Sequence, residues 1–146
     1  MLTLEYTKQQ LPPMVCEFAE VIGWQATEDL IKALGGINFD FCTGARDSQR
    51  LQILYNIIGQ QKAHQLIQRF GGSSEYIPRC DKALRTLRNA RFKYDFMRLT
   101  ELEKKSGRMA MIELCPRYGI SDRTAWDIVR KHTAQITLPV STENPA

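Results

Sequence analysis

The sequence predicts a mainly α protein, with a helical core in which two short β-strands form a ribbon, followed by a C-terminal helix-turn-helix. Three observations predict this fold. Two Gly-Gly pairs each end a segment that reads as a helix, and a short extended segment follows each pair. Apolar residues recur at helical spacing after Arg79. Residues 113–131 read as two short helices that meet at a tight turn through Gly119.

The composition is that of an ordinary soluble globular protein with one domain or two small ones, because 43% of the 146 residues are hydrophobic and 25% are charged. No apolar run approaches the length needed to cross a bilayer, and no basic segment precedes an apolar one at the N-terminus. We therefore expect a cytoplasmic protein with no membrane partner. The four cysteines and two histidines are widely separated. This spacing predicts reduced, buried thiols and neither a metal site, a disulfide nor a cofactor.

The N-terminal part is predicted to be a duplicated core over residues 1–78. Residues 22–36 and 58–72 align with an offset of 36, and seven of these fifteen positions are identical. The two repeats cover about residues 15–44 and 47–78. Each is expected to contain a helix that ends near Ile-Gly, a second helix that ends at Gly-Gly, and a short strand. Such self-similarity is the signature of an internal repeat.

Two short strands are expected at equivalent places in the repeats. Residues 37–42 alternate between apolar and polar side chains. Residues 74–77 are followed by Pro78, which disfavours helix at the preceding residue and cannot donate to a ladder. We expect the two strands to pair. A two-stranded ribbon is only marginally stable alone, so it should lie against the helices.

A linking helix is predicted over residues 79–106. Asp81 is a candidate cap, and Ser106-Gly107 is a natural stop, so the helix is expected to run to Lys105. One of its faces carries an apolar stripe typical of a buried core, formed by Leu84, Leu87, Ala90, Tyr94 and Met97.

The helix-turn-helix is predicted over residues 107–136, and residues 137–146 are expected to form a flexible tail. Gly119 can adopt the positive φ that ends the first helix, and the Ser121 hydroxyl can cap the second. Pro116 is expected to shorten or distort the first helix near its end. The residues expected to pack the two helices together are Ile112, Leu114, Ile120, Ala125, Ile128 and Val129. Those expected to face outward, where such a motif contacts DNA, are Ser121, Asp122, Arg123, Trp126, Asp127 and Arg130.

Charge is distributed unevenly along the chain. Residues 1–74 carry six Lys/Arg and seven Asp/Glu, whereas residues 75–146 carry fourteen and nine. The basic half contains the predicted helix-turn-helix. Such asymmetry is expected of a module that neutralises DNA phosphates, although a solvated helix face would also carry interleaved charges.

Four motifs follow one another in a specific order between about residues 61 and 131. They are Gly71-Gly72-Ser73-Ser74-Glu75-Tyr76-Ile77-Pro78-Arg79, Tyr94-Asp95-Phe96, Ser106-Gly107-Arg108 and Glu113-Leu114-Cys115-Pro116-Arg117-Tyr118-Gly119-Ile120. This order closely resembles the Mor/C family of phage transcription activators. That family has a helical dimerisation region, a Gly-Gly turn into a strand with Tyr-Ile-Pro-Arg, a linking helix and a C-terminal helix-turn-helix. This chain departs from the family pattern in two ways. It has several extra residues between Phe96 and Gly107, and it carries twice the unit of a helix, a Gly-Gly pair and a strand.

The resemblance implies a bacterial or phage regulator that binds promoter DNA as a dimer and recruits host RNA polymerase. It implies that Ser121–Lys131 is the recognition helix, and that Tyr76 and Arg79 lie near DNA. Arg79, Arg117, Arg130 and Lys131 would mainly hold phosphates, while the outward face of the recognition helix supplies specificity. The candidate DNA-binding residues are Tyr76, Arg79, Arg117, Ser121, Asp122, Arg123, Thr124, Trp126, Arg130 and Lys131.

The duplication leaves two forms of assembly open. In the family, each of two chains would contribute one strand to a central antiparallel pair. Here one chain could supply both strands, which would give a pseudo-twofold core and one DNA-reading unit per core. The protein is therefore expected to be a homodimer or a pseudo-dimeric monomer.

Three other functions are alternatives to an activator. A repressor of the same fold would act from a different site relative to polymerase. A protein-binding adaptor, whose helix-turn-helix no longer binds DNA, is favoured by the acidic Asp122 and Asp127. An enzyme is not expected, because each Gly-Gly pair ends a helix and does not open one around a phosphate, and no metal ligands cluster.

Overall fold

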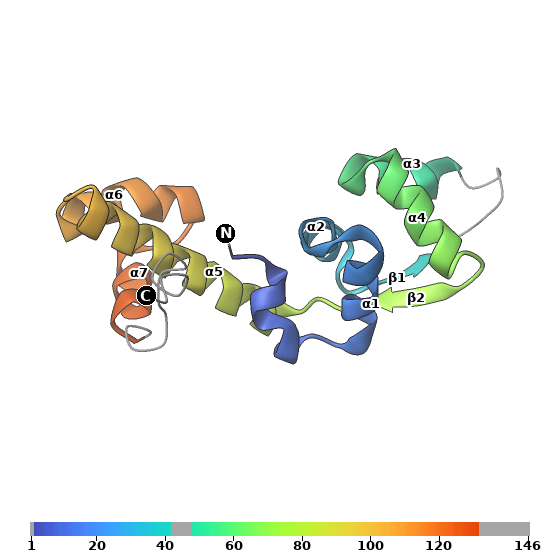
Figure 1. Cartoon of the computed structure of the whole chain (residues 1–146), viewed down its shortest axis with the longest axis horizontal. Helices are drawn as coiled ribbons and strands as arrows, with labels where there is room; N and C mark the ends of the chain where they lie inside the picture. Colours follow the sequence, from blue (N-terminus) through green and yellow to red (C-terminus); the bar gives the residue numbers. More distant parts are fainter. Residues whose placement is uncertain (1, 42–47, 132–146) are drawn as a thin grey trace, which may run out of the picture. The chain divides into compact units, whose positions relative to one another are not determined.

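Residues 2–41 and 48–131 are described by a computed structural model of the chain (Figure 1). The chain divides into two compact units. The first unit comprises Thr3–Leu84, and the second begins at Arg85 and includes Leu2. The predicted mainly α fold with two short strands in a ribbon is confirmed, because the described ranges are mainly helical and contain one two-stranded antiparallel ribbon. Within those ranges, no helix has both the length and the apolar character that crossing a membrane requires.

The first unit contains short helices on either side of each strand. Its elements, in chain order, are η1 (Leu4–Gln10), α1 (Pro13–Ile22), α2 (Trp24–Leu34), β1 (Ile37–Asp40), α3 (Ser48–Ile58), α4 (Gln60–Phe70) and β2 (Ser74–Ile77). The segment η1 is a 3₁₀ helix that packs on α2 and buries Leu4 and Thr7. Cys42, the last residue of the predicted first strand, lies outside the described residues.

The backbone of the first unit repeats at an offset of 36 residues. Helices α2 and α4 begin and end at equivalent positions. Gly23 and Gly59 separate the paired helices with φ of 88° and 87°. Gly36 and Gly72, which precede the strands, have φ of 90° and 88°. Residues that carry a Cβ rarely adopt such φ angles, which explains why glycine occurs at both equivalent pairs of positions.

The ribbon pairs β1 with β2 of the same chain (Figure 1). Its register places Ile37 opposite Ile77, Asn38 opposite Tyr76, Phe39 opposite Glu75 and Asp40 opposite Ser74. Two flanking hydrogen bonds are equivalent in the repeats: the Gly36 amide donates to the Ile77 carbonyl, and the Gly72 amide donates to the Phe41 carbonyl, both at 2.6 Å. The pairing is therefore pseudo-twofold, with its centre at Phe39 and Glu75.

One hydrophobic core joins both repeats. Phe18, Phe41 and Phe70 pack together, and the Phe18 and Phe70 rings meet nearly edge-on with centroids 5.1 Å apart. Leu30 and Leu66 lie at equivalent positions, and both are fully buried. The strict alternation expected for residues 37–42 holds only in part. Phe39 and Phe41 are buried, but Ile37, at the end of the ribbon, is 48% exposed.

Helix α5 (Asp81–Met97) crosses the boundary between the units and continues into a π-helical turn, η3 (Arg98–Leu102). The prediction that this helix runs to Lys105 is wrong. It ends at Leu102, because Lys104 adopts a left-handed φ of 59° and the chain changes direction. The predicted apolar stripe is also only partly correct. Leu87 and Ala90 are buried, but the other buried positions of α5 are Ala83, Phe92 and Lys93, and Leu84, Tyr94 and Met97 are half-buried.

Helices α6 (Gly107–Tyr118) and α7 (Asp122–Lys131) complete the second unit. Gly119 ends α6 in the left-handed conformation, at φ 67° and ψ 34°. The Ile120 amide donates to the Cys115 carbonyl at 3.1 Å, a bond typical of a glycine C-cap. Helix α6 continues through Pro116 for its full twelve residues.

One residue predicted to pack the two helices together faces solvent instead. Ile112 is 61% exposed, whereas Ala110, Met111 and Leu114 are buried. Two residues correspond to about 200° around a helix, so Ile112 lies opposite both Ala110 and Leu114. The other predicted contacts agree with the structure: Leu114, Ala125 and Ile128 are buried, and Ile120 and Val129 pack against them.

Candidate nucleic-acid interface

Helix α7 has one buried face and one exposed face. Ala125 and Ile128 are buried in the second unit's core. The opposite surface carries polar and charged side chains, which we call the α7 surface: Ser121, Asp122, Arg123, Thr124, Arg130 and Lys131. Asp127 lies at its margin and is half-buried. A helix packed in this way presents hydrogen-bonding and charged groups to a partner without losing its own core.

Ser121 caps α7, as the sequence predicted. Its Oγ accepts from the Thr124 amide at 3.1 Å and donates to the Thr124 hydroxyl at 3.0 Å. This pair satisfies one of the amides that a helix N-terminus leaves without an intrahelical partner. Both hydroxyls are therefore held in position by each other at the first turn of α7.

Trp126 does not face outward, and this expectation was wrong. Its ring packs edge-on against Phe96 of α5, with centroids 5.8 Å apart. A Cβ added to Gly107 would lie only 3.1 Å from the indole Cη2. Trp126 therefore fixes α7 against α5 and the start of α6. A large aromatic side chain gains more from this packing than from exposure to water.

A buried lysine holds the other end of α7. Lys93 of α5 is only 3% exposed, and its Nζ donates to the Val129 carbonyl at 2.6 Å. Burial lowers the pKa of Lys93, partly opposed by the nearby Glu101 carboxylate. A cation at a helix C-terminus satisfies carbonyls that have no intrahelical donor. Lys93 is not among the residues predicted from the sequence, although its spacing of three residues from Ala90 places it on the buried side of α5.

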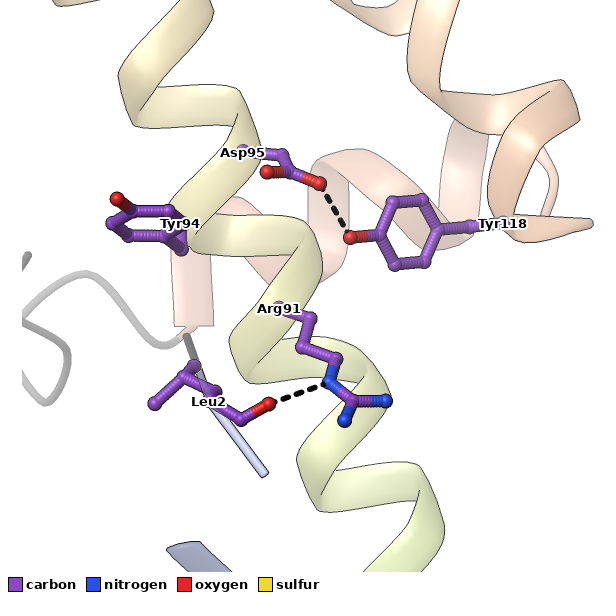
Figure 2. A pocket seen from close by; sticks show the side chains of 5 residues that line it. All are labelled: Leu2, Arg91, Tyr94, Asp95 and Tyr118. Carbon is purple, nitrogen blue, oxygen red and sulfur yellow. Dashed lines mark hydrogen bonds between the residues drawn. The ribbon is translucent and has the colours of Figure 1, made fainter. Parts of the chain in front are cut away.

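Tyr118 ties the end of α6 to α5. Its hydroxyl donates to Asp95 Oδ2 at 2.6 Å, as Figure 2 shows, and its ring packs edge-on against Phe92. Burial raises the pKa of Tyr118, and the hydrogen bond to Asp95 raises it further. A cavity of about 200 Å³ beside this bond is lined by Leu2, Arg91, Tyr94, Asp95 and Tyr118. The Arg91 guanidinium contributes a further bond there, from Nε to the Leu2 carbonyl at 3.1 Å.

The Tyr118→Phe variant is expected to lose about 1–2 kcal/mol of the second unit's unfolding free energy, because Asp95 loses its phenol donor. The raised pKa also sets the pH dependence. The neutral Tyr118 phenol makes its full contribution to the unfolding free energy below the usual tyrosine pKa of about 10. That contribution is lost as pH rises through the raised pKa of the folded state. Urea unfolding at increasing alkaline pH would check this. If the Tyr118→Phe variant lost as much stability above about pH 10 as the wild-type protein does, the assignment of this pH dependence to Tyr118 would be wrong.

The candidate phosphate-binding residues differ in their ion pairs. Arg117 contacts Glu113 at 3.2 Å and Asp95 at 3.9 Å, and Arg130 contacts Asp127 at 3.5 Å. Among the residues that the structure describes, Arg123 and Lys131 form no ion pair. These two side chains can therefore bind a phosphate or a base without first breaking an ion pair with a carboxylate.

The candidate residues of the ribbon lie in the first unit. Tyr76 of β2 is 54% exposed, and Arg79 is exposed and contacts Asp81 at 3.3 Å. The structure places them at the same end of the ribbon, because Arg79 follows the Ile37–Ile77 pair by two residues.

In the described parts of the chain, His, Cys, Asp and Glu side chains do not gather into a group of three that could hold a metal ion.

Comparison with known proteins gives one match. The model of the Mor transcription activator family matches residues 46–138, which include α3, α4, β2, α5, α6 and α7. The first repeat, through β1, precedes the matched residues. Neither the curated proteins nor the solved structures contain a significant match. Because the family model covers more than half of the chain, this protein belongs to the Mor transcription activator family, a family of regulators.

Proposed function

We propose that this protein is a phage or prophage activator that binds promoter DNA sequence-specifically through the α7 surface and recruits host RNA polymerase in the cytoplasm. The observation that carries the proposal is the division of α7 into a core face and the α7 surface, within the family-matched residues. A helix that follows a tight turn and is packed on one side can present its other side to a DNA groove.

Two positions on the α7 surface have different proposed roles. Arg123 lies in the first turn of α7, where recognition helices contact base edges, and a guanidinium suits guanine O6 and N7. Lys131 lies at the other end, where an ammonium suits a phosphate. Tyr76, Arg79, Arg117, Asp122, Ser121, Thr124 and Arg130 remain proposed contacts. Trp126 is not proposed as one, because its ring packs against Phe96.

The matched variants Arg123→Ala and Lys131→Ala test this division. Arg123→Ala should weaken binding to the preferred site by about 1–3 kcal/mol and relax one base preference. Lys131→Ala should weaken binding to all sequences alike and reduce the salt slope by about one. Gel shifts with promoter fragments at two salt concentrations would measure both effects. Equal, salt-insensitive binding by the two variants would refute the division.

A protein-binding adaptor is the second candidate, and a specific observation favours it. Asp122 is exposed and Asp127 is half-buried, so the surface that would approach phosphates carries negative charge. An aspartate can nevertheless accept from cytosine N4, so the charge is compatible with base recognition. Failure of the wild-type chain to bind any DNA at low salt would favour the adaptor. The position of the bound site relative to polymerase would distinguish activator from repressor.

We also propose that one chain forms the complete core and carries a single DNA-reading unit. The duplicated core (1–78), the linking helix (79–106) and the helix-turn-helix (107–136) would be its parts. Support comes from the pairing of β1 with β2 and the equivalent flanking hydrogen bonds. A symmetric operator would then require two chains. Sedimentation at low micromolar concentration should give the mass of one chain, 16.8 kDa. An obligate dimer with intermolecular strand pairing would overturn the proposal.

A further inference from the structure

The last turn of α7 carries two exposed cations, Arg130 and Lys131. A helix of ten residues is too short to be stable by itself in water. Helix ends also fray, because the last four carbonyls have no donor within the helix. The place of these two charges therefore depends on what holds the last turn.

The contacts described above at the start and the middle of α7 lie before this turn. The Ser121 Oγ accepts from the Thr124 amide at 3.1 Å, which caps the first turn. The Trp126 ring packs against Phe96 of α5 in the middle of the helix. Both contacts lie three or more residues before the last two positions of α7, so they leave the end of the helix to be held separately.

Lys93 of α5 supplies a donor to the last turn. Its Nζ donates to the Val129 carbonyl at 2.6 Å, and the residue is only 3% exposed. Lysine is almost never buried to this extent without a polar partner, because its ammonium loses its hydration. Val129 directly precedes Arg130 and lies two residues before Lys131. The bond therefore fixes the backbone from which both exposed cations project.

We propose that Lys93 is a positioning residue for DNA binding, whose hydrogen bond to Val129 sets the place of the Lys131 ammonium against a phosphate. The inference rests on the proposed function, because the ligand is the phosphate backbone of double-stranded DNA. Lys93 is buried and does not itself touch DNA. Salt screens charges that are far apart, so a phosphate contact requires close approach. A frayed last turn would leave Lys131 charged and would lose this contact.

Lys93→Met tests the proposal, because methionine keeps most of the buried apolar stem and removes the donor. On a duplex selected by the wild-type chain, it should reduce the slope of log K against log[salt] by about one, as Lys131→Ala does. The base preference assigned to Arg123, at the other end of α7, should remain. The double variant Lys93→Met/Lys131→Ala should have the slope of Lys131→Ala alone, because both substitutions remove the same contact. A reduction of about two in the double variant would overturn the proposal.

Lys82 provides the matched control, because it is an exposed lysine of the same helix. Lys82→Met removes the same formal charge and should keep the wild-type salt slope. A reduction equal to that of Lys93→Met would show that net charge, and not position, determines the slope. Thermal unfolding of each variant would identify a temperature at which all are folded, so that lower stability alone does not change the slope.

A second substitution keeps the test decisive if Lys93→Met does not fold. Lys93→Gln is uncharged, and its amide nitrogen stops one bond short of the position of Nζ. It should reduce the salt slope in the same direction as Lys93→Met. A folded Lys93→Gln variant with the wild-type slope would overturn the proposal.

Failure of this inference can be distinguished from failure of the proposed function. If Lys131→Ala reduces the slope while a folded Lys93→Met variant keeps it, Lys93 does not position Lys131, and DNA binding by the α7 surface stands. If the wild-type chain binds no DNA at low salt, the proposed function fails and the inference fails with it.

Discussion

Replacing Phe18 by alanine is expected to lower the free energy of unfolding of the first unit by roughly 3–5 kcal/mol. Phe18 is fully buried and packs against both Phe41 and Phe70. Removal of its ring deletes apolar contacts and leaves a cavity that surrounding backbone cannot fill completely. Domains of this size are stable by only about 5–15 kcal/mol, so the substitution should remove a large share of the unit's stability. Denaturant unfolding followed by far-ultraviolet circular dichroism would measure the change.

The equivalent residue of the second repeat provides the control. Leu54 lies 36 residues after Phe18 and is also buried in the same core. Leu54→Ala should cost roughly 2–5 kcal/mol. Because the two side chains belong to one core, each variant should unfold both repeats in a single cooperative transition. Two separate transitions, with only the substituted repeat destabilised, would show that the repeats fold independently and would contradict a shared core.

The Trp126→Ala variant is expected to destabilise the second unit by roughly 2–4 kcal/mol, a little less than a fully buried tryptophan would. The indole is half-buried and packs against Phe96 and Gly107. Trp126→Phe retains an aromatic edge in this space and should cost about 1 kcal/mol. Thermal unfolding of both variants would rank the two losses.

The same pair of variants distinguishes packing from DNA reading at Trp126. If the indole acts through packing, DNA affinity should fall only in proportion to the unfolded fraction, and Trp126→Phe should bind like wild type. A stable Trp126→Ala variant that has lost specific binding would instead show that the indole contacts DNA. The structural assignment of Trp126 would then be wrong.

Local signals in the sequence were sufficient to predict the ribbon and the turn. Each Gly-Gly pair ends a helix, because Gly36 and Gly72 adopt the positive φ that other residues avoid. Strand β2 ends at Ile77, where Pro78 follows. The left-handed Gly119 and the Ser121 cap were likewise predictable, since both act within a few residues along the chain.

Contacts between distant residues were not predictable in the same way. The spacing of Trp126 is compatible with either face of a helix, and its partner Phe96 lies thirty residues earlier. Lys93 was overlooked because its acceptor is the carbonyl of Val129, on another helix. The π-helical turn η3 ends α5 early at a left-handed lysine, which no composition rule indicates. Sequence patterns thus located the elements, and tertiary packing decided which residues of the candidate site are exposed.

The mass of the protein–DNA complex tests the central claim most directly, that one chain supplies a whole core and one recognition helix. A duplex selected by the wild-type chain would be mixed with the protein at low micromolar concentration and examined by sedimentation equilibrium. The account predicts a complex of one 16.8 kDa chain per single half-site, weakened by Arg123→Ala. A complex that forms only with two chains per half-site, or no complex at low salt, would contradict it.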